Sequence, residues 1–311
     1  MKRTFTICAA ALLVFVGLSV QAQQDPQISM NMYNRLYANP GYAGSNGGIC
    51  ATAILREQWA GFDGNPQTGI VTVESEVKAL HGGVGLSVTM DRLGAESTIA
   101  AKLAYAFRLD LGPGTLGIGV EGGIISRTLD GTKLTAIDKD DQNVPTGSTN
   151  GLVPDFGFGL YYHTDKLYFG VASSHLSEGS LDLDGFNGGT VEYSVARHYY
   201  AMAGYNYDIT PTLQLRPSLF LKSDAASTQF DINLSLMYNQ LVFAGVSYRV
   251  DDAVAVMAGV HWNGFKLGYA YDITTSGLNN YSNGSHEIML GYCYKWPTPS
   301  INQQYRNVRF L

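Results

Sequence analysis

The sequence is poor in charged residues, in cysteine and in long apolar runs. Charged side chains make up 15% of its 311 residues and the formal net charge is -6, which argues against a nucleic-acid binder because such proteins carry basic surfaces. After residue 22 no stretch approaches the roughly 18 apolar residues of a membrane helix. Of the 3 cysteines, Cys8 lies in the first apolar run, so neither a disulfide-rich scaffold nor a cysteine-based zinc site is expected.

Motifs of enzymes and metal sites are also missing. The 6 histidines show no HExxH or comparable spacing, and there is no Gly-x-Ser-x-Gly elbow. The acidic runs 138–141 and 182–187 do not complete an EF-hand, which needs a glutamate at its twelfth position. We therefore expect no catalytic residue, no metal and no cofactor, and we interpret the acidic runs as solvated loop charge.

Residues 1–22 have the pattern of a cleavable signal peptide. Lys2 and Arg3 precede the apolar run 7–18, and Val20-Gln21-Ala22 fits the small-x-small rule of a signal peptidase site. The apolar run is too short to anchor the chain in a bilayer. We expect residues 1–22 to be removed and the remainder to be exported.

The sequence is rich in glycine and aromatic residues, arranged in alternating segments. It contains 36 Gly, 20 Tyr and 13 Phe, a mixture that favours strands and turns. In the clearest segment, Phe230, Ile232 and Leu234 alternate with Asp231 and Asn233, which is the period of a β-strand. This alternation predicts an all-β chain of about 14 strands, near 49–59, 67–75, 82–91, 97–109, 115–128, 153–163, 167–174, 197–207, 212–223, 228–238, 241–250, 254–262, 265–272 and 285–296.

The connections between these segments fall into two classes. Every second one is short and rich in turn residues, such as 239–240 and 263–264, whereas the others include the long stretches 130–150, 175–196 and 273–284. Short periplasmic turns and longer extracellular loops are typical of a bacterial outer-membrane barrel. We therefore predict a single transmembrane antiparallel β-barrel over residues 49–296, in contact with the outer-membrane lipids of a Gram-negative bacterium.

Aromatic residues at the strand ends support this prediction. The alternative is a soluble secreted β-sandwich or propeller, but an aromatic girdle beside the short turns and the asymmetry of the loops decide against it. Pro217, in the middle of a segment, suggests a bulge there. The girdle would comprise Tyr105, Phe107, Tyr162, Tyr205, Tyr207, Tyr238, Trp262, Phe265, Tyr292, Tyr294 and Trp296.

The residues around the first segment resemble a known family. They are similar to the start of the PorP/SprF family of type IX secretion proteins, which usually has Ala where Gly41 stands. Weaker similarity appears at 91–94 and 285–290, and the first block alone is specific. The matching residues of that block are Gln24-Asp25-Pro26, Met32-Tyr33-Asn34, Asn39-Pro40-Gly41-Tyr42-Ala43-Gly44 and Arg56-Glu57-Gln58-Trp59.

The resemblance implies a non-enzymatic outer-membrane component of the type IX machinery for protein secretion, surface attachment and, in some relatives, gliding motility. Such a component would connect the outer membrane to a periplasmic peptidoglycan-binding lipoprotein and ring proteins, or to a secreted adhesin. The main alternative is an outer-membrane pore or small-molecule transporter.

Residues 23–48 precede the first strand, so we expect them to begin in the periplasm. They would tuck into the lumen as a small plug or lie across the periplasmic mouth, where either position suits partner contact. The alternative is that Asn39-Pro40-Gly41 is only a turn that leads into the strand. Residues 297–311 would form a periplasmic tail. We hypothesise partner contacts for Asp25, Pro26, Tyr33, Asn39, Pro40, Tyr42, Arg56, Gln58 and Trp59.

Strand parity suggests two pairings inside the barrel. Cys50 and Cys293 lie on the inward faces of the first and last segments, which are neighbours in a closed barrel, so they form either a seam-closing disulfide or two free thiols. Arg56 and Gln58 share that inward face if Trp59 faces lipid. We favour a structural role for Arg56, beside a carboxylate such as Glu121 or Asp231, over substrate binding, because an unpaired buried charge is costly.

Overall fold

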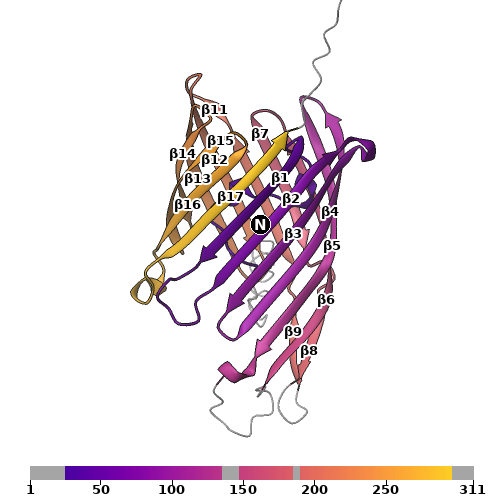
Figure 1. The fold of residues 1–311 in the computed structure, drawn as a ribbon, viewed down its shortest axis with the longest axis vertical. Helices are drawn as coiled ribbons and strands as arrows, with labels where there is room; N and C mark the ends of the chain where they lie inside the picture. Colours follow the sequence, from indigo (N-terminus) through magenta and orange to yellow (C-terminus); the bar gives the residue numbers. More distant parts are fainter. Residues whose placement is uncertain (1–24, 135–146, 185–189, 296–311) are drawn as a thin grey trace, which may run out of the picture.

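The computed structural model describes residues 25–134, 147–184 and 190–295. In these ranges the chain forms a closed antiparallel barrel of 14 strands, with one small hairpin beside it (Figure 1). No helix among these residues is long and apolar enough to cross a membrane. The signal peptide expected over residues 1–22, Trp296 and the tail expected over 297–311 lie outside the described residues.

The strand bounds follow the expected segments closely. The main differences are that the sixth strand begins at Ser148 instead of residue 153, and that the interval 175–196 contains a hairpin that the sequence analysis treated as loop. The barrel strands are β1 (Gly48–Glu57), β2 (Gln67–Val77), β3 (Gly82–Leu93), β4 (Glu96–Leu111), β5 (Gly114–Asp130), β6 (Ser148–His163), β7 (Leu167–Ser174), β10 (His198–Tyr205), β12 (Leu213–Ser223), β13 (Thr228–Tyr238), β14 (Val242–Arg249), β15 (Ala253–Trp262), β16 (Phe265–Thr274) and β17 (Ser285–Lys295).

Shorter elements complete the description. The hairpin consists of β8 (Ser180–Asp184) and β9 (Thr190–Ser194), and its Leu181 and Leu183 side chains are buried. The two-residue β11 (Tyr207–Asp208) continues β10 beyond Asn206 and pairs with β12. The 3-10 turns are η1 (Asn31–Tyr33), η2 (Pro40–Tyr42), η3 (Lys78–Leu80), η4 (Gly131–Lys133) and η6 (Gly277–Asn280).

The first and last strands close the barrel. β1 and β17 lie side by side in Figure 1, and they pair antiparallel from Gly48 opposite Lys295 to Glu57 opposite His286. The strand ends then define two rims. We call the rim with turns such as Asn263-Gly264 the short-turn end, and the opposite rim, which carries the β8–β9 hairpin and η6, the long-loop end.

The distribution of exposed and buried residues is inverted relative to a soluble protein. On β13, Ile232 and Leu234 are each 45% exposed on the outer face, whereas Asp231 is 0% exposed and Asn233 2% exposed on the inner face. An apolar exterior and a polar interior are what lipid on one side and a polar lumen on the other require. This inversion is incompatible with the soluble sandwich or propeller considered above.

Pro217 does not produce the bulge suggested by its position. The β12–β13 register runs without a shift from Leu213 opposite Tyr238 to Ser223 opposite Thr228. On its other side, β12 pairs with β10 up to Ser218 and again with β11 from Leu215, in the same register. The missing N–H of proline therefore coincides with a local break in the neighbouring ladder.

Residues 25–47, which we call the strap, run through the inside of the barrel. The strap begins at the long-loop end, where Asp25 contacts His175 and His198, and it leaves at the short-turn end, where Ser45 accepts a hydrogen bond from Arg108. The segment was expected to begin in the periplasm, and therefore at the short-turn end. That direction is wrong for the described residues, because polar groups near the long-loop end bind the first residues of the strap.

Candidate functional site

Polar groups of the barrel hold the strap at three heights. Between these attachments, apolar residues of the strap pack against the wall. Ile28 and Met30 are 2% and 0% exposed and pack with Ile54, Ile70 and other wall residues. Burying side chains of this size contributes on the order of 2 kcal/mol each. The strap is thus packed as a core of the barrel, not laid loosely in a channel.

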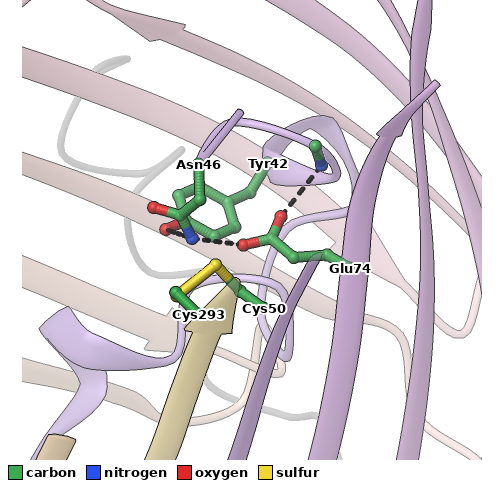
Figure 2. Close-up of a disulfide and its surroundings, with 6 residues drawn as sticks. Tyr42, Asn46, Cys50, Glu74 and Cys293 are labelled. Atoms are coloured by element: carbon green, nitrogen blue, oxygen red, sulfur yellow. Dashed lines mark hydrogen bonds between the residues drawn. A yellow bond between two sulfur atoms is a disulfide. The ribbon is translucent and has the colours of Figure 1, made fainter. Parts of the chain in front are cut away.

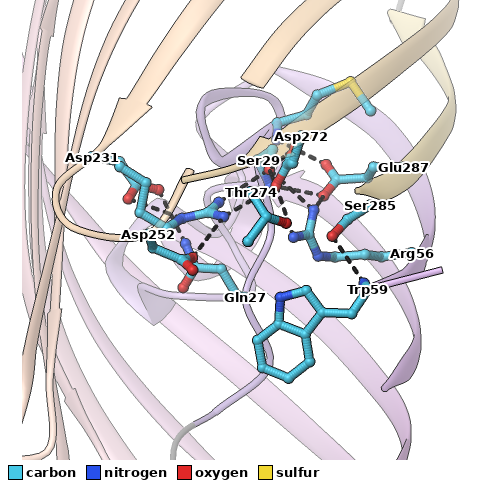
Figure 3. Close-up of polar contacts among 12 residues, drawn as sticks. Gln27, Ser29, Arg56, Trp59, Asp231, Asp252, Asp272, Thr274, Ser285 and Glu287 are labelled. Carbon is cyan, nitrogen blue, oxygen red and sulfur yellow. Dashed lines mark hydrogen bonds and ion pairs between the residues drawn. The ribbon is translucent and has the colours of Figure 1, made fainter. Parts of the chain in front are cut away.

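The middle of the strap is attached by a group of buried charges that we call the arginine cluster (Figure 3). Arg56 Nη2 lies 2.8 Å from Asp272 Oδ2, and Arg56 Nη1 lies 3.1 Å from Glu287 Oε2. Arg249 Nη1 lies 3.0 Å from the same Asp272 oxygen, and Arg249 Nε lies 3.3 Å from Asp231 Oδ1. Side chains of five strands, β1, β13, β14, β16 and β17, therefore meet in this cluster inside the barrel.

The strap lies within this cluster and completes it. The backbone N–H groups of Ser29 and Met30 donate to the two oxygens of Glu287, at 2.7 and 2.8 Å. Ser29 Oγ donates to Asp272 and accepts from Arg56 at 3.0 Å and from Arg249 at 3.0 Å. Because buried charges are tolerated only when they are paired and hydrogen-bonded, strap and cluster depend on each other.

The beginning of the strap is held by a second group, which we call the Asp25 cluster. Asp25 Oδ1 lies 3.0 Å from His175 Nε2, and the Asp25 N–H donates to His198 Nε2 at 3.0 Å. Tyr200 Oη donates to the other carboxylate oxygen, and Lys222 Nζ donates to the Asp25 carbonyl at 2.7 Å. The first described residue of the strap is thus bound through its side chain and both of its backbone groups.

Electrostatics favour the ionised pair in the Asp25 cluster. Burial by itself would raise the pKa of Asp25, but His175 and His198 outweigh it and hold that pKa well below its usual range. Burial would likewise lower the pKa of His175, but the carboxylates of Asp25 and Asp155 raise it to about 9. His175 is therefore an imidazolium bridge at neutral pH, with its Nδ1 3.0 Å from Asp155 Oδ1.

The side chains of Asp25, His175 and His198 also form the arrangement most like a metal site among the described residues, with their ligand atoms within 4.8 Å of one another. Each of these atoms already has a partner. His198 Nε2 accepts the Asp25 N–H, and both nitrogens of His175 face carboxylates. A cation could bind there only by displacing these contacts.

The end of the strap is fitted closely against the barrel wall. Asn39 caps η2 by accepting the Gly41 N–H at 2.8 Å, and its amide donates to the Leu160 carbonyl at 3.0 Å. Glycines in the wall permit the approach, because a Cβ on Gly119 would lie 2.3 Å from Gly41 N. The wall under η2 therefore has to be free of side chains.

The strap joins β1 beside a disulfide (Figure 2). Glu74 accepts the Gly44 N–H at 2.9 Å with one carboxylate oxygen and the Asn46 amide with the other. Cys50 and Cys293 are register partners in the β1–β17 ladder, and the structure joins them in a disulfide. Strap exit and barrel seam thus lie next to each other at the short-turn end.

The structure places the candidate contact residues in three different settings. Asn39, Pro40 and Arg56 are buried against the wall, whereas the half-buried Asp25, Pro26, Tyr33 and Tyr42 lie in the lumen. Gln58 and Trp59 follow the end of β1, where the Trp59 N–H donates to Ser285 Oγ at 3.0 Å. β1 ends at Glu57, so Gln58 and Trp59 lie just beyond the strand that was expected near 49–59.

Arg56 does face the lumen, but neither expected carboxylate is its partner. Glu121 pairs with Lys102 at 3.2 Å and Asp231 pairs with Arg249, whereas Arg56 binds Asp272 and Glu287. Parity identifies which residues point inward, but the partner depends on the register and tilt of strands that are distant in sequence. The roles of His175, His198 and Arg249 were not predicted, because each is only one polar residue at a strand end or at an inward-facing position.

The family described as type IX secretion system membrane protein PorP/SprF matches residues 20–292. A search of curated proteins gave no match.

Solved structures resemble the chain only distantly. Omp33 of Acinetobacter baumannii is 11% identical, with 79% of this chain and 98% of that chain covered and a TM-score of 0.45. A Pseudomonas aeruginosa FadL homologue is 12% identical, with 79% and 89% covered and a TM-score of 0.42. The KdgM porin in complex with disordered oligogalacturonate is 7% identical, with 79% and 98% covered and a TM-score of 0.38. The family match extends over nearly the whole barrel, and the chain belongs to the PorP/SprF family of type IX secretion system membrane proteins.

Proposed function

We propose that this outer-membrane barrel is a non-enzymatic connecting subunit of the type IX machinery, closed internally by its own strap. It would link periplasmic lipoprotein and ring components, or a secreted surface protein, to the outer membrane. In outer-membrane barrels the short turns face the periplasm, so the strap leaves the lumen on the periplasmic side. The observation that carries the proposal is the strap itself, bound at the Asp25 cluster, the arginine cluster and Glu74.

A strap held in this way favours a connecting role over free diffusion through the barrel. Removing it from the lumen would strand Asp272, Glu287 and Asp231 without the donors supplied by Ser29, Met30 and Gln27. The pore or small-molecule transporter remains the competing function, and its distinguishing property is conductance.

Under this proposal the candidate contact residues fall into three groups according to which side of the membrane a partner could reach them from. Tyr33 and Tyr42 line a hollow at the periplasmic end and are the stronger candidates for partner contact. Asn39, Pro40 and Arg56 would act indirectly, by holding the strap in place. Gln58 and Trp59 follow the opposite end of β1 and would serve only a partner at the cell surface.

Photo-crosslinking in native membranes tests the connecting role. A photo-reactive residue at Asn263, exposed in a short turn, would capture a periplasmic component, whereas one at Asn279, exposed in η6, would capture a secreted surface protein. Deleting residues 25–34 is expected to leave a folded barrel, recognised by its heat-modifiable migration, but to abolish capture and export. Export and capture that persist after the deletion, or no crosslink from either position, would contradict the proposal.

A further inference from the structure

The two halves of the lumen differ in how their positive charges are compensated. Toward the long-loop end, Arg56, Arg249, Lys102 and Arg127 each lie within ion-pair distance of a carboxylate. Toward the short-turn end, the lumen carries a hollow of about 180 Å³ that contains the cations Arg35, Arg216 and Lys266. Among the described residues, no carboxylate lines this hollow and none forms an ion pair with these three cations.

Neutral groups make some contacts with these cations. The Arg35 guanidinium lies 3.7 Å above the Tyr168 ring, and its Nη1 donates to Tyr161 Oη at 3.0 Å. Arg216 Nε donates to Gln214. The oxygens of Glu74 accept hydrogen bonds from Asn46 and from the strap backbone (Figure 2). Asp208 and Glu74 act on Arg216 and Lys266 from beyond ion-pair distance, so no carboxylate of the described residues is in direct contact with the positive charge of the hollow.

Buried polar atoms without partners surround the same hollow. Arg35 Nε and His261 Nε2 are inaccessible to solvent and have no hydrogen-bond partner among the described residues, whereas Tyr33 Oη lies beside the Ser235 hydroxyl. Arg35 and His261 both line the hollow. Since an unsatisfied buried polar atom costs roughly 1–3 kcal/mol, two of them beside cations that no carboxylate contacts favour a site adapted to a ligand.

We propose that this hollow binds an oxyanion, a phosphate or carboxylate group, that enters from the periplasm. Arg216 and Lys266 supply charge, and Arg35 supplies the remaining guanidinium N–H groups. The lining consists of the strap and inward-facing strand residues, together with Tyr205 and Pro217 of the outer face at the break in the ladder. The hollow lies toward the short-turn end, so the group would reach it through the periplasmic mouth. The volume suits one small anionic group, such as an inorganic anion or a terminal carboxylate of a larger molecule.

This inference is independent of the proposed connecting function. It requires only the position of the hollow and the orientation of the barrel, and it would hold equally for a pore. Failure of the crosslinking experiment would therefore leave it intact, and failure of anion binding would leave the connecting role intact.

Equilibrium dialysis of the full chain in detergent with radiolabelled inorganic phosphate tests the site. We expect saturable binding that is weakened about tenfold or more in Arg216→Gln and in Lys266→Gln, because each removes a charged hydrogen bond. Lys78→Gln removes an exposed lysine from the same end of the barrel, outside the hollow, and should bind phosphate as the unaltered protein does. Heat-modifiable migration identifies the variants that fold.

Competition with acetate defines the class of anion. Displacement of phosphate by acetate would assign a general oxyanion site, and binding of phosphate that acetate does not displace would assign a phosphate site. Either result supports the proposal. Absence of saturable phosphate binding by the unaltered protein, or equal weakening in Lys78→Gln and the two hollow variants, would overturn it.

Discussion

Arg56 on β1 and Asp272 on β16 form a buried ion pair, with Arg56 Nη2 2.8 Å from Asp272 Oδ2 and both side chains 1% exposed. β17 lies between these strands, and its Glu287 binds the same arginine. The pair therefore spans the barrel seam. Because Ser29 bonds to all three side chains, the seam and the strap are joined at one point.

Replacing Arg56 by Met should release the strap from this point. The substitution leaves Asp272 and Glu287 with less compensation inside the barrel, and breaking a buried pair in this way costs about 3–5 kcal/mol. Hydrogen exchange of the Ser29 and Met30 amides, which donate to Glu287, measures the free energy of local opening. Arg92→Met alters an exposed arginine and should leave these amides protected. Equal protection in both variants would show that the ion pair does not hold the strap.

Adding a methyl group to the wall under η2 should displace the end of the strap. A Cβ on Gly119 would lie 2.3 Å from Gly41 N, whereas a Cβ on Gly122 of the same strand would meet Phe156 at an ordinary 3.7 Å. Overpacking of this kind costs about 1–3 kcal/mol. We expect faster exchange of the Gly41 and Tyr42 amides in Gly119→Ala and no change in Gly122→Ala. Identical exchange in the two variants would contradict the close fit.

The Asp25 cluster should weaken as the pH rises. The pKa of His175 is raised to about 9 in the folded protein, from an ordinary value of about 6.5 when unfolded. Its contribution is therefore complete below about pH 6.5 and is lost as the pH rises to about 9, with a magnitude of roughly 3 kcal/mol. The groups facing the imidazole are Asp25 and Asp155, with His198 and Lys102 nearby.

Protease cleavage within the first residues of the strap provides the readout. We expect cleavage to increase between pH 7 and pH 10 in the unaltered protein. His175→Gln cannot carry the charge, so its cleavage should be high and independent of pH over this range. A flat profile in the unaltered protein would show that the imidazolium bridge does not hold the strap.

The disulfide can be tested by counting thiols. Cys50 and Cys293 are bonded in the structure, so the mature protein unfolded without reductant should show no free thiol, and the reduced protein should show both. Cys50→Ser should lower the free energy of unfolding by roughly 2–5 kcal/mol, the usual range for a native bridge. Two reactive thiols in the oxidised protein would contradict the bonded seam.

Local pattern predicts the wall of this barrel well, for a physical reason. Lipid outside and polar groups inside impose a period of two on every strand. The sequence therefore predicts directly that Ile232 faces outward and Asp231 faces the lumen. The hairpin of Leu181 and Leu183 was missed because it lies outside the wall, and Pro217 was misread because its effect falls on a neighbouring ladder.

The site is harder to predict because its contacts are long-range. The position of Arg56 in its strand predicts an inward-facing charge. Asp272 and Glu287 become its partners only because the barrel closes and its strands tilt. Likewise, nothing near Asp25 in sequence shows that His175 and His198 will bind it. The resemblance to the PorP/SprF family located the strap residues without indicating that they thread the barrel from the long-loop end.

Single-channel recording in planar bilayers tests the closed barrel most directly. The unaltered protein should show little conductance, because the strap occupies the lumen, and the variant lacking residues 25–34 should show larger and more frequent openings. Regular conductance steps of the same size in the unaltered protein and in the deletion variant would contradict a barrel closed by its strap and would favour the pore.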